Sequence, residues 1–372
     1  MFDVAVIGAG LAGLHCARLL GAHGLRVALI DRKRSIADNV QPTGIFVRKT
    51  WEDFALPAEQ LGAPIRRVTL YSPARRALTL EADHDEFRVG RMQWIYLWML
   101  EQCCRAGVVW MPSTRITSLA DVPARFVIGA DGARSLVARE LRLDRNREML
   151  VGLEEIVASR GGKPQLHCYL DPRLAPGYIA WLCDDGEESH IGVAGYRGAF
   201  DPAASLQRFR ESIGETRRAI ERRGGLIPVG GILRRIANER GLLVGDAAGA
   251  VSPLTAGGLD AALRLSEFAA RVTASYFDSS DPRVLSEYSG DAFRARFITR
   301  TWMRRLMRVA SNRPMMELAC ALLRTPPLRA FAAHVFFARG SFPDPPSLRF
   351  QWRTGASPVR TGEGACPPLF RT

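Results

Sequence analysis

The first thirty residues alternate apolar runs with a segment of small residues. The apolar run from Asp3 to Ile7 turns at Gly8 directly into a stretch rich in alanine and leucine, which predicts a strand followed by a helix. A second apolar run, from Val27, predicts another strand that ends at the acidic Asp31. Strand, glycine turn, helix and strand in this order are typical of a Rossmann-like α/β domain.

The remaining pattern predicts that this domain is interrupted and then resumed. Short β-like runs between residues 67 and 88 predict a small insertion sheet, and apolar positions three and four apart predict a helix over 90–104. Runs at 108–111 and 124–129 resemble returning strands of the nucleotide domain. Four runs separated by turns between 150 and 196 predict an antiparallel sheet, and helical spacing follows over about 203–223.

These elements divide the chain into seven segments. We expect an α/β protein whose Rossmann-like nucleotide-binding domain is discontinuous, with an inserted antiparallel-sheet domain and a helical C-terminal region. The boundaries are 1–66, 90–149 and 236–285 for the three parts of the nucleotide-binding domain, 67–89 for the small inserted strands, 150–235 for the antiparallel-sheet domain, 286–340 for the helical region and 341–372 for a flexible tail.

The first glycine-rich turn has the spacing of a dinucleotide site. In this motif Gly8 permits the tight turn, Gly10 lets the backbone approach a pyrophosphate, and Gly13 lets helix and strand pack closely. Asp31 follows Gly13 by eighteen residues, close to the separation expected for an acid that binds a ribose hydroxyl. The strand before the turn and the helix after it support a true nucleotide site.

A second glycine-rich segment lies more than two hundred residues later. An apolar strand from Leu242 ends in Gly-Asp at Asp246, and Gly257 and Gly258 then open an alanine-rich helix. The segment therefore aims one carboxylate and one helix N-terminus at a ligand. Together with the first motif, it indicates a flavin nucleotide.

Two further positions carry candidate chemistry. Arg91 stands at the start of the helix over 90–104, where the helix dipole disfavours a cation, so an anionic partner explains it better than simple exposure. Asp131 and Gly132 end an apolar strand and precede a helix, a pattern that serves a ligand site and a structural turn equally well.

Composition excludes several other classes of protein. The chain has 372 residues, 47% of them apolar, and a formal charge of +13, but only three lysines and no basic stripe with interleaved aromatics, which argues against nucleic-acid binding. The histidines are dispersed and the seven cysteines contain no C-x-x-C pair, so we expect no metal site and a cytoplasmic protein. The C-terminal helices have apolar faces with arginines beside them. This pattern fits two alternatives, helices packed on the antiparallel-sheet domain or a peripheral contact with the inner face of a membrane.

The ordered set of motifs resembles a known superfamily. Gly8-x-Gly10-x-x-Gly13, Asp31, Arg91, the segment 129–135 and Gly245-Asp246-Ala-Ala-Gly249 are similar to the FAD-dependent superfamily that includes p-hydroxybenzoate hydroxylase and the geranylgeranyl reductases, over about residues 1–340. Aromatic hydroxylases commonly carry histidine where this chain has Gly249, and the stretches 176–183 and 225–231 are similar to the reductases. Residues 42–45 and 256–259 differ from the usual reductase runs, which leaves the substrate open.

The resemblance implies that the discontinuous Rossmann-like domain is an FAD-binding domain and that the inserted antiparallel sheet is a substrate domain. It also implies roles for named residues. Arg32 would flank the adenine, Arg91 would lie near the phosphates and ribityl chain, and Asp246 would accept hydrogen bonds from flavin hydroxyls, with Asp131 and Gly132 supporting that region. The helix opening at residues 257–258 would stabilise the anionic reduced flavin. The candidates for lining the substrate are the polar and aromatic residues of the sheet, Tyr178, Trp181, Cys183, His190 and Tyr196. No hydrolytic triad or carboxylate pair stands out, so the catalytic residues are unknown.

The function implied by the resemblance is reduction. We expect a geranylgeranyl reductase-like enzyme that reduces a carbon–carbon double bond of an isoprenoid or other apolar small molecule by hydride transfer from reduced flavin. An FAD monooxygenase acting through a flavin C4a-hydroperoxide is the alternative, and a non-redox flavoprotein such as a cyclase is a further one. No second G-x-G-x-x-G follows a strand, so the electron donor is NAD(P)H, bound transiently, or a ferredoxin.

Overall fold

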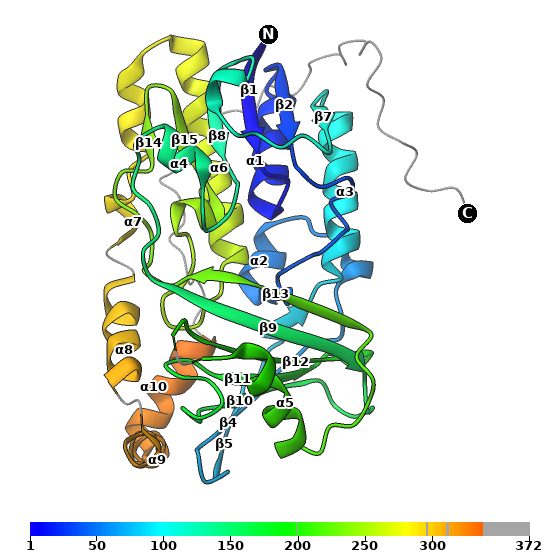
Figure 1. Cartoon of the computed structure of the whole chain (residues 1–372), viewed down its shortest axis with the longest axis vertical. Helices are drawn as coiled ribbons and strands as arrows, with labels where there is room; N and C mark the ends of the chain where they lie inside the picture. The colour runs from blue at the N-terminus through cyan, green and yellow to red at the C-terminus, as the bar shows by residue number, and fades with distance from the viewer. Residues whose placement is uncertain (199, 295–296, 310–311, 338–372) are drawn as a thin grey trace, which may run out of the picture.

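A computed structural model describes residues 1–198, 200–294, 297–309 and 312–337 (Figure 1). The expected flexible tail, residues 341–372, lies outside the described residues. Two large sheets, one above the other in the view of Figure 1, account for most of the strands, and the C-terminal helices flank the lower sheet.

The upper sheet is the Rossmann-like sheet that the sequence predicts. Its strand order is β14-β15-β8-β1-β2-β7, and every pairing is parallel except that between β14 and β15. The strands are β1 (Phe2–Ile7), β2 (Val27–Ile30), β7 (Val109–Met111), β8 (Ala124–Gly129), β14 (Ala237–Asn238) and β15 (Gly241–Leu243). Segments from three distant parts of the chain therefore complete one nucleotide-binding sheet.

Apolar strands and small-residue helices build the core of this domain. Strands β1 and β2 are almost entirely apolar and buried, as parallel strands covered on both faces must be. Helix α1 (Leu11–Ala22) contacts both α3 (Met92–Arg105) and α6 (Leu259–Ser279). Short elements complete the domain: α2 (Arg48–Asp53), α4 (Leu136–Glu140) and the 3₁₀ turns η1 (Ala58–Gln60), η2 (Leu119–Asp121), η3 (Gly245–Ala248) and η4 (Pro282–Glu287).

The lower sheet has seven strands in the order β13-β9-β12-β11-β10-β4-β5. Its strands are β4 (Arg67–Tyr71), β5 (Ala77–Glu81), β9 (Met149–Ala158), β10 (Gln165–Tyr169), β11 (Ala180–Asp184), β12 (Glu188–Tyr196) and β13 (Glu221–Pro228). The antiparallel sheet predicted between residues 150 and 196 is confirmed, because β9, β12, β11 and β10 pair antiparallel in that order. Strands β13 and β5 add further antiparallel pairs, whereas β10 and β4 run parallel. Strands β9 and β13 lie along the boundary with the upper domain (Figure 1).

The expectation of a small insertion sheet between residues 67 and 88 is wrong in two respects. Strands β4 and β5 form no small separate sheet, because β4 pairs with β10 and aligns Val68 and Leu70 with Leu166 and Cys168 in one apolar layer. The third inserted strand, β6 (Phe87–Val89), pairs instead with β3 (Ile45–Val47). Alternation along one strand cannot reveal which distant strand completes its apolar face.

The helix expected over 203–223 is shorter than its pattern. Helix α5 (Pro202–Ser212) is capped by Asp201, whose carboxylate accepts hydrogen bonds from the backbone N–H groups of Ala203 and Ala204, and the chain turns at Gly214 with a φ of +64°. Residues 221–228 then form β13 against β9. Pairing with a long neighbouring strand overrides the helical spacing of the last residues.

The C-terminal region is helical, as predicted. It contains α7 (Asp291–Arg294), α8 (Ile298–Val309), α9 (Arg313–Leu322) and α10 (Pro326–Phe337). In Figure 1, α8, α9 and α10 lie beside the lower sheet, whereas α7 lies beside the upper domain. Among the described helices, none combines the length and apolar character that crossing a membrane requires.

Candidate functional site

One cavity of about 1510 Å³ joins the two domains. Its upper part lies at the carboxyl ends of the Rossmann strands, where ligands of open α/β sheets bind. Its lower part lies between the seven-stranded sheet and the C-terminal helices. Of the glycines in the first motif, Gly8 and Gly10 line the cavity and Gly13 does not. The cavity is also lined by the other residues predicted to bind the cofactor except Arg91, namely Asp31, Arg32, Asp131, Gly132, Asp246, Gly257 and Gly258.

Each of the three glycines in the first motif is needed for a different structural reason. Gly8 has a φ of +104°, and a Cβ there would lie 2.3 Å from the carbonyl oxygen of Ala130. A Cβ on Gly13 would lie 1.9 Å from the carbonyl oxygen of Gly8, so this glycine allows helix and strand to touch. A Cβ on Gly10 would have no protein atom within 4 Å. The space beside Gly10 is therefore left open for a ligand.

The start of α1 offers free donors at the same place. Gly10 is the N-cap of α1 and provides no side-chain hydrogen bond, so the first N–H groups of the helix face the cavity without a cap. An uncapped helix N-terminus at a strand end binds phosphate through these N–H groups and the helix dipole. This arrangement suits the pyrophosphate of a dinucleotide.

Asp31 connects the glycine turn to the end of β2. Its carboxylate accepts a hydrogen bond from the backbone N–H of Ala9 at 2.7 Å and another from Lys33 at 2.8 Å. Asp31 and Arg32 both face the cavity. The acid thus stands beside the glycine turn, at the place where a Rossmann domain holds a ribose.

Asp131 has a structural task of its own. Its carboxylate accepts hydrogen bonds from the Ser135 hydroxyl and the backbone N–H of Leu136, both at 2.6 Å, and so caps α4. The adjacent Gly132, with a φ of +82°, continues the cavity wall. The Asp-Gly pair therefore shapes the cavity chiefly through its backbone.

Asp246 is the one acid of the second motif that points at the cavity without a partner. Its main-chain oxygen accepts a hydrogen bond from the Asn146 amide at 2.8 Å, but among the described residues no donor reaches its carboxylate. Burial raises its pKa from 3.8 to about 6. A ligand that donates hydroxyl hydrogen bonds to this carboxylate would relieve the cost of burying its charge.

The second motif also supplies a helix N-terminus. Helix α6 begins at Leu259, directly after Gly258, and its N-cap provides no side-chain hydrogen bond. The hydroxyl of Tyr178 donates to the carbonyl oxygen of Thr255 at 2.6 Å, which ties the lower sheet to this turn. The positive end of α6 therefore faces the cavity where the two domains meet.

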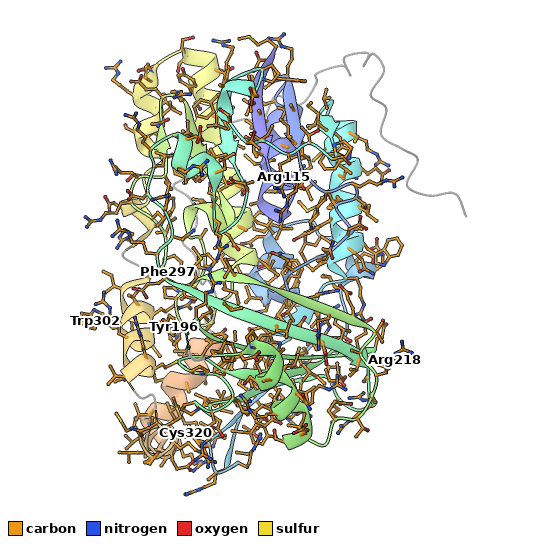
Figure 2. The ribbon with its side chains drawn as sticks, in the orientation of Figure 1. Arg115, Tyr196, Arg218, Phe297, Trp302 and Cys320 are labelled. Atoms are coloured by element: carbon orange, nitrogen blue, oxygen red, sulfur yellow. The ribbon has the colours of Figure 1, made fainter. Side chains whose placement is uncertain are left out.

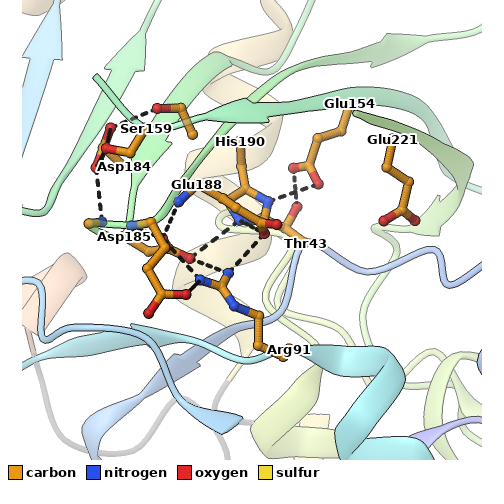
Figure 3. A network of polar contacts seen from close by, with 12 residues as sticks. Thr43, Arg91, Glu154, Ser159, Asp184, Asp185, Glu188, His190 and Glu221 are labelled. Carbon is orange, nitrogen blue, oxygen red and sulfur yellow. Dashed lines mark hydrogen bonds and ion pairs between the residues drawn. The ribbon is translucent and has the colours of Figure 1, made fainter. Parts of the chain in front are cut away.

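Arg91 is not where the resemblance suggested. It does not line the cavity, and its guanidinium donates to Asp185 at 2.6 Å, to Glu187 at 2.8 Å and to Glu188 at 2.9 Å (Figure 3). Its anionic partner is thus a group of carboxylates at the turn between β11 and β12, not the FAD phosphates. Their acidic run was visible in the sequence, but its position beside the start of α3 was not.

The five substrate candidates separate into two groups. Tyr178 and Trp181 line the cavity, whereas Cys183, His190 and Tyr196 do not. Cys183 and His190 are paired on β11 and β12 and are fully buried. Tyr196 lies beside α8, where its hydroxyl accepts a hydrogen bond from the Arg304 guanidinium at 3.0 Å (Figure 2).

The lower part of the cavity is apolar, and sequence patterns did not assign its residues. Side chains from the sheet meet side chains from α8, α9 and α10 around it. They include Leu166, Cys168, Leu170, Ile179, Met303, Leu306, Met307, Met316, Ala319, Leu323, Leu328, Phe331 and Phe336. The only signal in the sequence was the apolar spacing of the C-terminal helices, which packing alone also explains.

A buried polar chain adjoins this cavity at the boundary between the domains. Glu154 of β9 lines the cavity, and its Oε2 accepts hydrogen bonds from the Thr43 hydroxyl at 2.5 Å and the Trp181 indole at 2.9 Å. Figure 3 shows His190 between Glu154 and Asp185. Its Nδ1 lies 3.5 Å from Glu154 and its Nε2 lies 3.6 Å from Asp185.

The neighbours of His190 and Glu154 determine the direction in which the pKa of each group shifts. Burial alone would lower the pKa of His190, but Asp185 and Glu154 outweigh it and raise the pKa to about 9. Burial would also raise the pKa of Glu154, yet His190, Thr43 and Trp181 lower it. Asp185, Glu188 and His190 have the spacing of metal ligands, but Arg91 pairs with both carboxylates, so we assign an ion-pair network.

A second, polar cavity of about 970 Å³ shares Ala133, Arg134, Leu136 and Arg139 with the wall of the first. Its lining contains seven exposed arginines, namely Arg134, Arg139, Arg145, Arg147, Arg234, Arg235 and Arg294. Two acids, Asp144 and Glu148, accompany them. The surface next to the nucleotide end is therefore strongly basic.

The chain is similar to known proteins in sequence. Residues 2–102 match the family model described as pyridine nucleotide-disulphide oxidoreductase. A digeranylgeranylglycerophospholipid reductase from Methanothrix thermoacetophila is 26% identical over 76% of this chain and 80% of its own length, and digeranylgeranylglycerophospholipid reductase 2 from Methanothermobacter thermautotrophicus is 28% identical over 77% and 82%.

Two solved structures share the fold. A geranylgeranyl bacteriochlorophyll reductase-like protein from Thermoplasma acidophilum superposes with a TM-score of 0.78, at 18% identity over 91% of this chain and 97% of its own. PqsL, a probable FAD-dependent monooxygenase from Pseudomonas aeruginosa, gives 0.61, at 19% identity over 85% and 98%.

Fold, glycine motifs and cavity together define an FAD-dependent oxidoreductase. The chain is similar to the superfamily that includes p-hydroxybenzoate hydroxylase and the geranylgeranyl reductases, and the curated relatives named above are reductases.

Proposed function

We propose that this protein reduces a carbon–carbon double bond of an isoprenoid or another long apolar molecule. The observation that carries the proposal is the continuity of one cavity from the dinucleotide end to the apolar space under α8, α9 and α10. An aromatic ring would occupy only a small part of that apolar space, whereas an extended polyprenyl chain could follow it. The names of the digeranylgeranylglycerophospholipid reductases among the relatives support the same substrate class.

The residues described above fit FAD. The N-terminus of α1 and the open space at Gly10 would take the pyrophosphate, Asp31 and Arg32 the adenosine end, and Asp246 the hydroxyls of the ribityl chain. Reduced FAD supplies, when bound, the hydride that adds to one carbon of the double bond. The N-terminus of α6 at residues 257–258 would favour negative charge near its positive end.

Metabolite analysis tests the proposal directly. Apolar extracts of cells with the intact gene would be compared by mass spectrometry with extracts of cells that carry Asp246→Ala. Products that gain pairs of hydrogen atoms support the reductase, whereas products that gain oxygen would establish the monooxygenase instead. The monooxygenase is the second candidate function because the chain shares its fold with PqsL.

The electron donor approaches, in this proposal, from the arginine-lined second cavity. Its seven exposed arginines adjoin the wall of the nucleotide site, and Arg134 and Arg139 line both cavities. Phosphates of NAD(P)H and acidic carriers such as ferredoxins are both attracted by such a surface. Anaerobic mixing with NADH, NADPH or reduced ferredoxin, followed through the flavin absorbance, distinguishes the donors.

Filling the apolar end should block the substrate without disturbing the flavin. Ala319 of α9 lines the cavity, whereas Ala321 on the same helix is exposed and does not. We expect Ala319→Trp to lower kcat/KM by at least about tenfold, since the indole occupies space that the chain of the substrate needs. Reduction of a glycerophospholipid carrying geranylgeranyl chains is the measurement, with FAD content recorded in parallel. Ala321→Trp is the matched control, and equal losses in both variants would contradict the assigned path.

Helix α8 would bring this cavity to a membrane surface. Ile298, Trp302, Leu306 and Val309 form one exposed apolar face, with exposed fractions of 56%, 62%, 69% and 65% (Figure 2). Arg305 and Arg308 flank it, and Leu306 also lines the cavity. Apolar residues with neighbouring arginines suit the interface of an anionic bilayer. Co-sedimentation with anionic and neutral vesicles measures this contact.

A further inference from the structure

Saturating a double bond takes a proton as well as a hydride. The proposed function assigns the hydride to reduced FAD, but it names no donor for the proton that the second carbon takes. Among the described residues that line the cavity, Glu154 is a carboxylate connected directly to a buried histidine. The following inference rests on the proposed function and names its proton source.

Glu154 stands where the two domains meet. The loop after the nucleotide-binding strands crosses to the lower sheet, and Thr43 in this loop donates its hydroxyl to Glu154 while Pro42 accepts a hydrogen bond from Arg223 of β13. Thr43 and Glu154 both face the cavity, and Trp181 holds the same carboxylate oxygen. Glu154 is only 4% exposed, so its carboxylate reaches the cavity from a buried position.

His190 connects Glu154 to the edge of the protein. The side chain is 2% exposed, and its two ring nitrogens have no hydrogen-bond partner at ordinary distance. Instead they lie 3.5 Å from Glu154 and 3.6 Å from Asp185. Contacts between catalytic groups are often this long before substrate binds, and small movements close them. On the far side, Glu188 and Glu187 have side chains 32% and 80% exposed.

We propose that Glu154 and His190 form a buried proton relay that delivers a proton from solvent to the substrate carbon opposite the hydride. In the transfer, the Nδ1–H bond of the His190 imidazolium breaks as an O–H bond forms on Glu154. That O–H bond then breaks as the new C–H bond forms on the substrate. The hydride reduces the double bond and leaves the flavin oxidised, so the proton completes the balance. A proton from solvent returns to His190 through the Asp185 and Glu188 side.

The surrounding charges favour this distribution of protons. His190 is protonated up to a pKa of about 9, while the pKa of Glu154 is lowered, so the proton rests on the imidazole at neutral pH. Asp185 and Glu188 face the ring from the β11–β12 turn and Arg91 faces these acids from α3. Arg223, itself paired with Glu221, acts on Glu154 from β13.

The test uses glutamine substitutions in the holoenzyme. Glu154→Gln keeps an oxygen for Thr43 and Trp181 but cannot pass on a proton, and His190→Gln removes the proton store. Glu155→Gln is the matched control, because Glu155 is the next residue of β9, is equally buried, and pairs with Arg210 and Arg222 outside the cavity. Turnover is measured with a glycerophospholipid carrying geranylgeranyl chains, from pH 6 to 10. The titration of His190 is followed by NMR of ring-labelled protein and assigned from the His190→Gln spectrum.

We expect turnover to fall at least about 100-fold in Glu154→Gln and His190→Gln and to stay within twofold in Glu155→Gln. FAD content and reduction by dithionite should be unchanged in all three. Wild-type turnover should decline above about pH 9, as His190 loses its proton, and the NMR pKa of His190 should be lower in Glu154→Gln.

Two results would overturn the relay. One is turnover in Glu154→Gln equal to that of Glu155→Gln, and the other is an His190 ring that is neutral at pH 7 in the wild type. A wild type that reduces no prenyl double bond, although its His190 titrates near pH 9, would instead overturn the proposed function.

Discussion

Gly10→Ala is expected to lose FAD while the protein keeps its fold. A Cβ at this position meets no protein atom within 4 Å, and the φ of −76° suits any residue. The added methyl group would occupy the space that we assign to the pyrophosphate, beside the uncapped N–H groups of α1. We expect the Kd for FAD to rise at least about 100-fold, or about 2.8 kcal/mol, with the far-UV circular dichroism unchanged. Equilibrium titration of the apoprotein with FAD measures the effect.

Two other glycines serve as comparisons for this result. Gly230 is exposed and lies outside the FAD cavity, and a Cβ there makes only an ordinary contact with Glu148, so Gly230→Ala should bind FAD normally. Gly13→Ala should fail differently, because its Cβ would lie 1.9 Å from the Gly8 carbonyl oxygen and must disrupt the packing of α1 on β1. A Gly10→Ala protein that purifies with a full complement of FAD would contradict the assigned pyrophosphate site.

Asp246→Asn is expected to stabilise the apoprotein and to weaken FAD binding. Burial raises the pKa of this carboxyl from 3.8 to about 6. At pH 8 the native apoprotein therefore carries a buried charge that costs more free energy than the same charge in the unfolded chain. Removing the charge should raise the free energy of unfolding by up to about 3 kcal/mol at pH 8. The bound flavin loses hydrogen bonds to a charged acceptor, which should raise its Kd about 10- to 100-fold. Urea unfolding of the apoprotein and FAD titration measure the two effects.

The raised pKa of Asp246 also predicts how the stability of the apoprotein changes with pH. An acid whose native pKa is raised costs no stability below pH 3.8, and the cost grows until pH passes about 6. The stability difference between wild type and Asp246→Asn should therefore be small at pH 4 and constant above pH 7. Affinity for FAD should fall by up to about tenfold per unit below pH 6 in the wild type only. Asp201→Asn, at the cap of α5, is the control, and equal pH slopes in all three proteins would refute the role of Asp246.

The two parts of the cavity differ in the hydrogen-bonding groups that their walls offer to a ligand. At the nucleotide end, Asp246, the start of α1 and the start of α6 face the cavity with unused hydrogen-bonding capacity. At the other end the walls are almost wholly apolar, and at the boundary the polar chain of Glu154 and His190 begins. This order places the hydride donor, the proton donor and the apolar substrate next to one another in the proposed reaction.

Segments in which neighbouring residues carry the information could be predicted from the sequence. Strand β1, the turn at Gly8 and helix α1 follow from apolar runs and glycines within a dozen positions. The same holds for the strand that leads to Asp246 and for the start of α6 after Gly258, because a helix start depends on the residues that flank it. The C-terminal helices were likewise predicted from their own spacing.

Features that join distant segments could not be predicted in this way. The partners of Arg91 lie 94 to 97 positions away, and Thr43 and Glu154 are 111 apart. Strand β4 could extend the large sheet only because its apolar face matched that of β10.

The sequence by itself thus determined a Rossmann-like flavoprotein with its two glycine motifs, because local backbone geometry requires those residues. The tertiary structure alone decided that Arg91 pairs with protein carboxylates, that Glu154 and His190 adjoin the cavity, and that helices α8 to α10 enclose its apolar end. These contacts depend on strand register and on the packing of remote elements, which no local pattern encodes.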